Sequence, residues 1–311
     1  MQLGSGITGI TVLFPEEDRY GTDEDFSNCM SNVVVSTAAT NSKIGGQPPH
    51  VGTASIGSSP LPYLTAFDGI LNNVQDIESM AVGNGITSTA FELDGLVRRI
   101  PLVFNIGETL YPSFSMEILR GLAGAPSYAI KSSDIGVDAL RIQNFPIIKT
   151  DSQARIWVNW NTSFKTISAA DYFKHPKPNT VAIIGVTAKG TSTLVATPAG
   201  LKAPHEVQAA VLSTLITGTN ISRPRWAEDT ELLVLLGGLL ILLLLSFKVY
   251  LSLPALLVAV GGTIWYTMDA FATQQILLDP SFGVLAALIL WAVSSFTNYL
   301  REFKLKQQIK K

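Results

Sequence analysis

Long apolar segments gather in the last quarter of the chain, whereas the first 225 residues alternate between short apolar and polar runs. Three apolar runs follow one another there: Leu232 to Phe247, which contains no charged residue, Leu251 to Phe271 and Phe282 to Phe296. With its polar shoulders each reaches roughly 20 residues, which a helix needs to cross about 30 Å of hydrocarbon. As buried core helices, the three would require a larger soluble core than the rest of the chain provides. The pattern predicts a membrane region at 226–299 with three transmembrane helices, at about 231–248, 250–271 and 279–299.

Residues 1–225 mix two periodicities, which predicts a mixed α/β domain. Five segments read as strands: Ile7 to Phe14, Val33 to Ser36, Ile100 to Phe104, Arg155 to Trp160 and Val181 to Val186. Helices are predicted at Tyr111 to Leu119 and at His205 to Ile216, and Gly218 terminates the second of these. A further helix is predicted to start at Ser168, which acts as its N-cap with Asp171 at the third position. The stretch 40–62 is dense in Gly, Pro and Ser and favours a long surface loop.

Two strand predictions are more specific. Residues 181–186 form a continuous apolar run, typical of a parallel strand buried on both faces. Asp94-Gly95 is a turn pair between two apolar segments, which predicts a strand, turn, strand arrangement over residues 85–104.

The basic residues predict the orientation of the membrane region. The chain around the link between the second and third spans carries Asp269 and Asp279 and no Lys or Arg. The segment 300–311 contains five basic residues: Arg301, Lys304, Lys306, Lys310 and Lys311. Cytoplasmic segments are rich in Lys and Arg, so we expect a multi-pass protein of the cytoplasmic membrane with its C-terminus inside and residues 1–225 outside the cytoplasm. Because Met1-Gln2-Leu3-Gly4 opens no signal peptide, we also expect the N-terminus to be incomplete.

Composition and charge reduce the number of function classes that fit this chain. The net charge of −2 combines an acidic soluble part with a basic tail, so an extended cationic face for nucleic acid is not expected. Cys29 is the single cysteine and cannot form an intrachain disulfide. An acidic set at residues 16–25 reads either as a solvated loop before a short helix or as a cation site.

Residues for catalysis or for holding a cofactor are not found. His50, His175 and His205 lie far apart, without the spacing of a zinc site. Residues 185–192 nearly spell a phosphate-binding loop, but Thr191 stands where that loop needs lysine, so we reject a nucleotide site. We therefore expect no catalytic residue, no metal and no cofactor in this chain.

Asp94, Arg98 and Arg99 are the candidate site residues, as a polar cluster at a domain edge. Such a cluster forms either a structural salt bridge or a contact to a ligand. The Arg98→Ala change separates the two readings, because loss of a ligand contact leaves folding intact.

The order of several short motifs adds a family resemblance. The motifs are Phe14-Pro15-Glu16, Leu93-Asp94-Gly95 with Arg98-Arg99 and Pro101, Tyr111-Pro112-Ser113, Ile167-Ser168-Ala169, Ile183-Ile184-Gly185 and Thr197-Pro198. With three apolar segments behind them, the chain resembles the CHASE-type extracellular sensor domains of the second type, found in bacterial transmembrane receptors. The chain differs from that family at two places. The acidic residue that the family has shortly before Thr197-Pro198 is missing, with Thr193 nearby, and the helix start has a different sequence, Pro204-His205-Glu206.

The resemblance implies a sensor preceded by one helix, followed by three spans and then a cytoplasmic effector. The effector is most often a class III adenylate or guanylate cyclase, and otherwise a protein kinase or a diguanylate cyclase. Residues 300–311 look like the linker that leads into the cyclase members, which implies a homodimer. The expected partners are the lipid bilayer and an extracytoplasmic small-molecule or envelope signal. The alternative is a membrane-anchored binding or scaffold protein of the cell envelope without signalling output.

Overall fold

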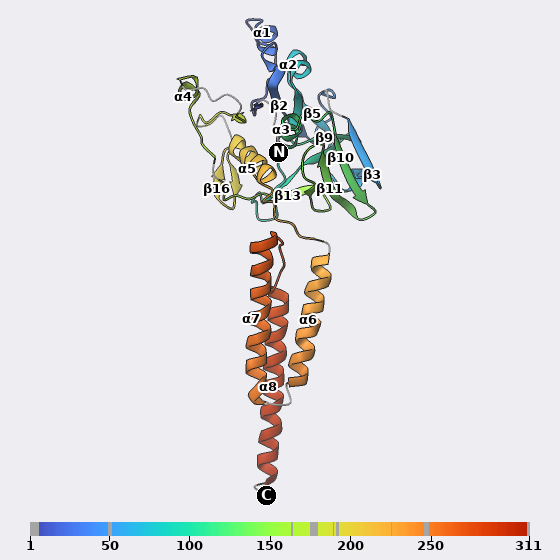
Figure 1. Ribbon diagram of the computed structural model, residues 1–311, viewed down its shortest axis with the longest axis vertical. Helices are drawn as coiled ribbons and strands as arrows, with labels where there is room; N and C mark the ends of the chain where they lie inside the picture. The colour runs from blue at the N-terminus through green and yellow to red at the C-terminus, as the bar shows by residue number, and fades with distance from the viewer. Residues whose placement is uncertain are drawn as a thin grey trace. The chain divides into compact units, whose positions relative to one another are not determined.

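The chain divides into two compact units, Met1–Asn220 and Ile221–Lys311, in a computed structural model. The structure describes residues 6–48, 52–162, 164–174, 180–188, 190, 193–224, 226–245 and 249–309, and leaves the side chains of 242–245, 249–251 and 305 undescribed. The division falls five residues before the predicted boundary at 225. The first unit is a mixed α/β domain, as its pattern predicts (Figure 1).

A small parallel sheet forms the centre of the first unit. Its strands are β14 (Ala182–Ile184), β1 (Thr8–Ile10), β2 (Val33–Thr40) and β6 (Gly83–Ile86), with β5 (Gly69–Leu71) antiparallel to the far end of β2. The parallel pairing predicted for residues 181–186 is confirmed, but the predicted burial on both faces is wrong. β14 is the edge strand of the sheet, and Ile184 is 50% exposed.

A second sheet has the order β12-β11-β10-β3. Its strands are β3 (Thr53–Gly57), β10 (Tyr128–Ser133), β11 (Gly136–Ile142) and β12 (Ile148–Lys149). β3 lies inside the stretch predicted as a surface loop, so that prediction is wrong for these five residues. The strand is mostly exposed, and it exists because it pairs in parallel with β10, a partner more than 70 residues away that local composition does not reveal.

Three smaller sheets complete the unit. They are β4 (Thr65–Phe67), β8 (Val103–Ile106) and β9 (Thr109–Pro112); β7 (Arg99–Pro101) and β13 (Arg155–Trp157); and β15 (Val195–Thr197) and β16 (Gly200–Lys202). β13 confirms the predicted strand in its first half, with Ile156 buried at 1% exposure. The strand, turn, strand prediction over residues 85–104 is confirmed in part. Asp94-Gly95 lies in a turn that is followed by β7, but β6 ends at Ile86 and residues 87–92 form no strand.

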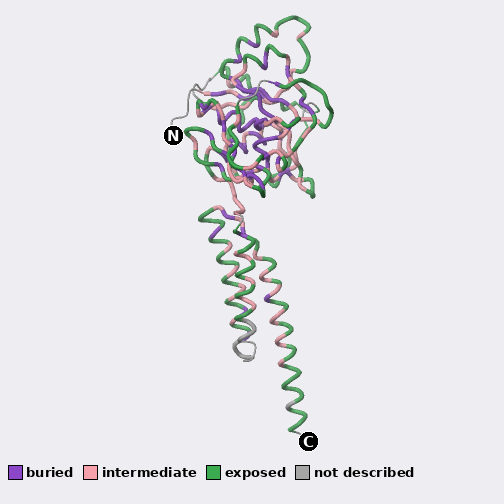
Figure 2. The backbone as a smooth tube through the Cα atoms, turned by 90° about the vertical axis from the view of Figure 1, so that its right-hand side faces the viewer, coloured by how far each residue is buried: buried purple, intermediate pink, exposed green. Residues whose placement is uncertain are grey.

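Two helices cover the core of the first unit. α3 (Phe114–Leu122) starts after the predicted point because Tyr111 and Pro112 belong to β9, and the Ser113 hydroxyl accepts a hydrogen bond from the Met116 N–H at 3.3 Å. α5 (Pro204–Thr217) ends at Gly218, whose φ of 65° suits glycine, as predicted. Short helices lie elsewhere: α1 (Asp23–Ser27), η1 (Met30–Asn32), η2 (Leu61–Tyr63), α2 (Gln75–Met80) and α4 (Ala169–Lys174). Figure 2 shows buried residues concentrated inside this unit.

The second unit consists of three long helices, α6 (Trp226–Leu245), α7 (Val249–Gln274) and α8 (Ser281–Ile309). Two segments are long and apolar enough to cross a membrane, Ser252–Gln274 and Ser281–Ile309. α6 carries three carboxylates near its start, and residues 246–248, which end its apolar run, lie outside the described residues. Large apolar side chains point outward along α7 and α8, including Val258 at 75% and Trp265 at 69% exposure, as lipid contact requires.

Candidate functional site

Asp94 and Arg98 form a bidentate pair at the surface of the first unit. The Arg98 Nη1 and Nη2 atoms donate to the two Asp94 carboxylate oxygens at 2.9 and 2.7 Å. Asp94 also accepts the Leu96 N–H at 3.2 Å, which closes the turn. The Arg98 hydrogen bonds are the main reason that the pKa of Asp94 falls to about 2. Both side chains are substantially exposed, at 33% and 50%.

Arg99 belongs to a separate and less exposed network. Its Nε and Nη2 atoms donate to both oxygens of Glu92 at 2.7 Å, and its Nη1 donates to Asp151 at 3.3 Å. The Arg99 guanidinium also lies 5.2 Å from the centre of the Trp157 ring. Asp151 in turn accepts from Arg155 Nε at 2.8 Å. The Arg99 hydrogen bonds lower the pKa of Glu92.

The predicted cluster is therefore two separate ion-paired networks. Arg98 pairs with Asp94 along the loop before β7, whereas Arg99, the first residue of β7, connects Glu92 of that loop to Asp151 and lies against Trp157 of β13. Each of the three predicted residues already has a charged partner. This geometry suits a structural role, and the ligand-binding role of Asp94, Arg98 and Arg99 stays a prediction.

A buried carboxyl group is present that the sequence pattern does not single out. Glu78 on α2 is 5% exposed, and its oxygens accept from the Asn73 N–H at 2.8 Å and from Asn72 Nδ2 at 3.2 Å. Asn73 Oδ1 accepts the Phe14 N–H, which follows β1, at 2.8 Å. Asn73 Nδ2 donates to the carbonyl of Ser36 in β2 at 2.9 Å. Burial raises the pKa of Glu78. The adjacent Asn72-Asn73 pair reads only as a turn, so this polar cluster is a product of tertiary contacts.

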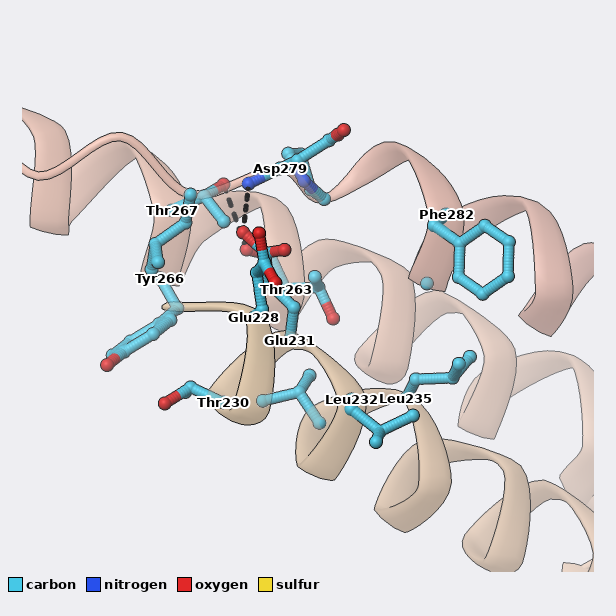
Figure 3. A pocket seen from close by; sticks show the side chains of 14 residues that line it. Glu228, Thr230, Glu231, Leu232, Leu235, Thr263, Tyr266, Thr267, Asp279 and Phe282 are labelled. Atoms are coloured by element: carbon cyan, nitrogen blue, oxygen red, sulfur yellow. Dashed lines mark hydrogen bonds between the residues drawn. The ribbon is translucent and has the colours of Figure 1, made fainter. Parts of the chain in front are cut away.

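The second unit contains a cavity of about 200 Å³ between its three helices. Its lining comes from α6 (Glu228, Thr230, Glu231, Leu232, Val234 and Leu235), α7 (Thr263, Tyr266 and Thr267), the link (Leu278, Asp279 and Pro280) and α8 (Phe282 and Gly283). Figure 3 shows Glu228 and Glu231 reaching from α6 toward the segment that carries Asp279. The Glu231 carboxylate accepts the Asp279 N–H at 2.7 Å and Arg223 Nη2 at 2.9 Å. No sequence motif marks this cavity, because its residues come from four separate segments.

The other candidate residues from the sequence are either bonded to near neighbours in the chain or lie outside the residues that the structure describes. In the acidic stretch, Asp23 accepts the Asp18 N–H at 2.7 Å and Asp18 accepts the Thr22 hydroxyl at 2.6 Å, which favours the loop reading. The described residues contain no group of three or more His, Cys, Asp or Glu that could hold a metal. His50, His175 and Thr191 lie outside the described residues, and His205 is buried at the start of α5 against Gly185.

Comparison with known proteins gives one result. The model of a family described as the CHASE2 domain matches residues 1–245, which include the whole first unit and the described part of α6. No curated protein and no solved structure gives a significant match.

Proposed function

Because this chain belongs to the CHASE2 domain family, we propose that it is the sensing and transmembrane region of a bacterial receptor. The first unit binds or responds to a signal outside the cytoplasm, and the helices of the second unit carry the response to a cytoplasmic effector. The observation that carries the proposal is the family match over residues 1–245, joined to helices with outward apolar faces. The effector we propose is a class III adenylate or guanylate cyclase, and the receptor is a homodimer because those active sites form between two chains.

We propose α6 as the first of three spans. Its charged residues lie at its beginning, whereas the stretch from Leu232 onward is uncharged up to Lys248. With the basic segment 300–311 inside, three spans place the first unit outside the cytoplasm. Fusions to alkaline phosphatase, which is active only outside the cytoplasm, test this orientation. Enzyme inserted between Asn220 and Ile221 of the full chain should be active and enzyme joined after Lys311 inactive, and the reverse result contradicts the topology.

A short connection between the units supports signal transfer. Asn220 Nδ2 donates to the Lys149 carbonyl inside the first unit at 3.1 Å. Ser222 exchanges backbone hydrogen bonds with Gln275 and Leu277 inside the second unit, both at 2.9 Å. Only Ile221 lies between these two attachments, so a displacement at the end of α5 reaches the helices with little slack. A ligand drives such a displacement only if it favours one of two arrangements.

Signal transfer is tested with a chimera in which this chain precedes the catalytic domain of a class III cyclase. Inserting four glycines after Ile221 lengthens the connection, and we expect cyclic nucleotide production to lose its dependence on the extracytoplasmic medium while its basal rate persists. The same insertion after Gly46, an open loop position, is the matched control. If cyclic nucleotide production by the unmodified chimera is the same in every medium tested, the result favours the alternative, a membrane-anchored scaffold protein of the cell envelope without signalling output.

A further inference from the structure

We propose that the cavity between α6, α7 and α8 is a binding site for an amphiphile that carries a protonated amine. The ammonium group lies against Glu228 and Glu231, and the apolar part extends between the helices. This site lies within the second unit and does not depend on the identity of the effector.

The cavity has the size and the mixed lining that such a ligand needs. Its volume of about 200 Å³ equals the space of roughly half a dozen water molecules, enough for a small amine headgroup. Carboxylates and hydroxyls, including those of Glu228 and Thr263, form one end, and Leu235 and Phe282 contribute to the apolar wall (Figure 3). An entirely polar ligand would place polar groups against that apolar wall without hydrogen-bond partners. An entirely apolar ligand would bury the carboxylates without partners.

A narrow apolar slot continues from this cavity. A second cavity, of about 20 Å³, shares Val234, Leu235, Thr263 and Gly283 with the first and continues to Ala259 and Ala287. A Cβ atom added at Gly283 would meet no atom within 4 Å, so glycine leaves open space at the junction of the two cavities. The slot therefore extends the apolar wall of the first cavity alongside the helices.

The charges at the polar end favour a cation. Glu228, Glu231 and Asp279 contribute three carboxylates, and among the described residues Arg223 is the cation paired with them, through Glu231. Both oxygens of Glu231 already accept hydrogen bonds, and the Ser281 hydroxyl and N–H lower the pKa of Asp279, which keeps it ionised. The Glu228 carboxylate has no hydrogen bond or ion pair within the described part of the chain, so it is available to an ammonium group.

The position along the helices fits an amphiphile. The cavity lies where the candidate span Ser252–Gln274 ends and the candidate span Ser281–Ile309 begins, at the boundary between hydrocarbon and water. An amine at that depth remains near water while its chain enters the hydrocarbon. A lipid with an ethanolamine headgroup and a free long-chain amine share this chemistry.

The test uses the full chain in non-ionic micelles, with dodecylamine as the probe and dodecanol as its uncharged counterpart, and native mass spectrometry counts the bound molecules. We expect saturable binding of dodecylamine at neutral pH, where the amine is protonated. Glu228→Gln and Gly283→Leu should each weaken it tenfold or more. Equal binding of dodecanol and dodecylamine would overturn the proposal.

Two matched variants control for general damage. Asp229→Asn removes a neighbouring carboxylate that does not line the cavity, and Gly262→Leu adds the same side chain at an exposed position of α7 that lines neither cavity. Both should bind dodecylamine within twofold of the unchanged protein. Unchanged binding by Gly283→Leu, or an equal loss in Gly262→Leu, contradicts the site. Replacing a helical glycine by leucine favours the helix, so folding is preserved.

A second measurement identifies the source of the amine. The full chain is reconstituted with equal amounts of phosphatidylethanolamine and phosphatidylcholine, and the retained lipid is identified. Enrichment of phosphatidylethanolamine that Gly283→Leu abolishes assigns the site to a lipid headgroup. Saturable dodecylamine binding without such enrichment assigns it to a free amine, and the absence of both overturns the proposal.

Discussion

At the scale of single residues, two arginines next to each other in sequence have different surroundings. Arg98 pairs with Asp94 in an exposed turn, whereas Arg99 joins Glu92 and Asp151 and stacks on Trp157. Exposed ion pairs contribute little because water screens them. Removing the partly buried Arg99 guanidinium instead takes the ion-pair partner from Glu92 and leaves Asp151 with Arg155 alone as its charged partner among the described residues.

Arg99→Ala should therefore destabilise the first unit, by about 2 kcal/mol or roughly 4–8 °C in Tm. Arg98→Ala is the matched variant, and we expect it to leave the Tm unchanged. Thermal unfolding followed by circular dichroism measures both. If Arg98→Ala lowers the Tm as much as Arg99→Ala does, Arg98 has a structural role that its exposed pair does not explain.

Glu78 gives a prediction about pH. Its pKa is raised in the folded protein, so its stabilising contribution is complete below the unfolded pKa and is lost as the pH rises through the folded pKa. Glu78→Gln cannot ionise and retains an oxygen to accept the Asn73 N–H. The Tm of the variant minus that of the unchanged protein should increase between pH 4 and pH 8. A difference that stays constant across this range contradicts the assignment.

At the scale of elements, α3 packs on the parallel sheet through glycines. A Cβ on Gly9 would meet the side chains of Phe114 and Ile118, and a Cβ on Gly85 would meet the backbone of Phe114. The helix therefore lies closer to β1 and β6 than any larger residue permits. This close approach buries Phe114 and Ile118 completely.

Gly85→Ala should be strongly destabilising, because the helix backbone has to move away from the added methyl group. Overpacking of this kind costs about 1–3 kcal/mol. Gly46→Ala is the control, since a Cβ there meets no atom within 4 Å. Urea unfolding should show a lower midpoint for Gly85→Ala alone, and equal midpoints for the two variants would show that α3 moves away freely.

At the scale of the whole molecule, two kinds of surface follow one another along the chain. The first unit buries its large apolar side chains, whereas α7 and α8 expose Val258, Trp265 and Phe282, among others. Such an extended apolar surface is stable in lipid and promotes aggregation in water. Both candidate membrane spans of the described residues therefore lie within residues 221–311.

The full chain should remain with the membrane fraction after an alkaline carbonate wash, because its helices are held by apolar burial and not by charge. A version that ends at Asn220 should be released. Immunoblots of the pellet and the supernatant measure the result. Recovery of the full chain in the wash would contradict the membrane assignment of α7 and α8.

The sequence by itself determined whatever depends on neighbours along the chain. Apolar runs set the positions of α7 and α8, a 3.6-residue period and Gly218 set α5, and the mixed periodicities indicated the α/β class. These features are readable because a helix satisfies its backbone locally and its apolar face repeats at a fixed interval.

Only the tertiary structure decided which distant segments meet. It made β3 a strand by pairing it with β10, left β14 at an edge, buried Glu78 among asparagines, and assembled a cavity from Glu228, Thr263 and Phe282. A strand takes its partners from elsewhere in the chain, and a pocket takes its lining from several elements, so neither leaves a periodic signal in the sequence.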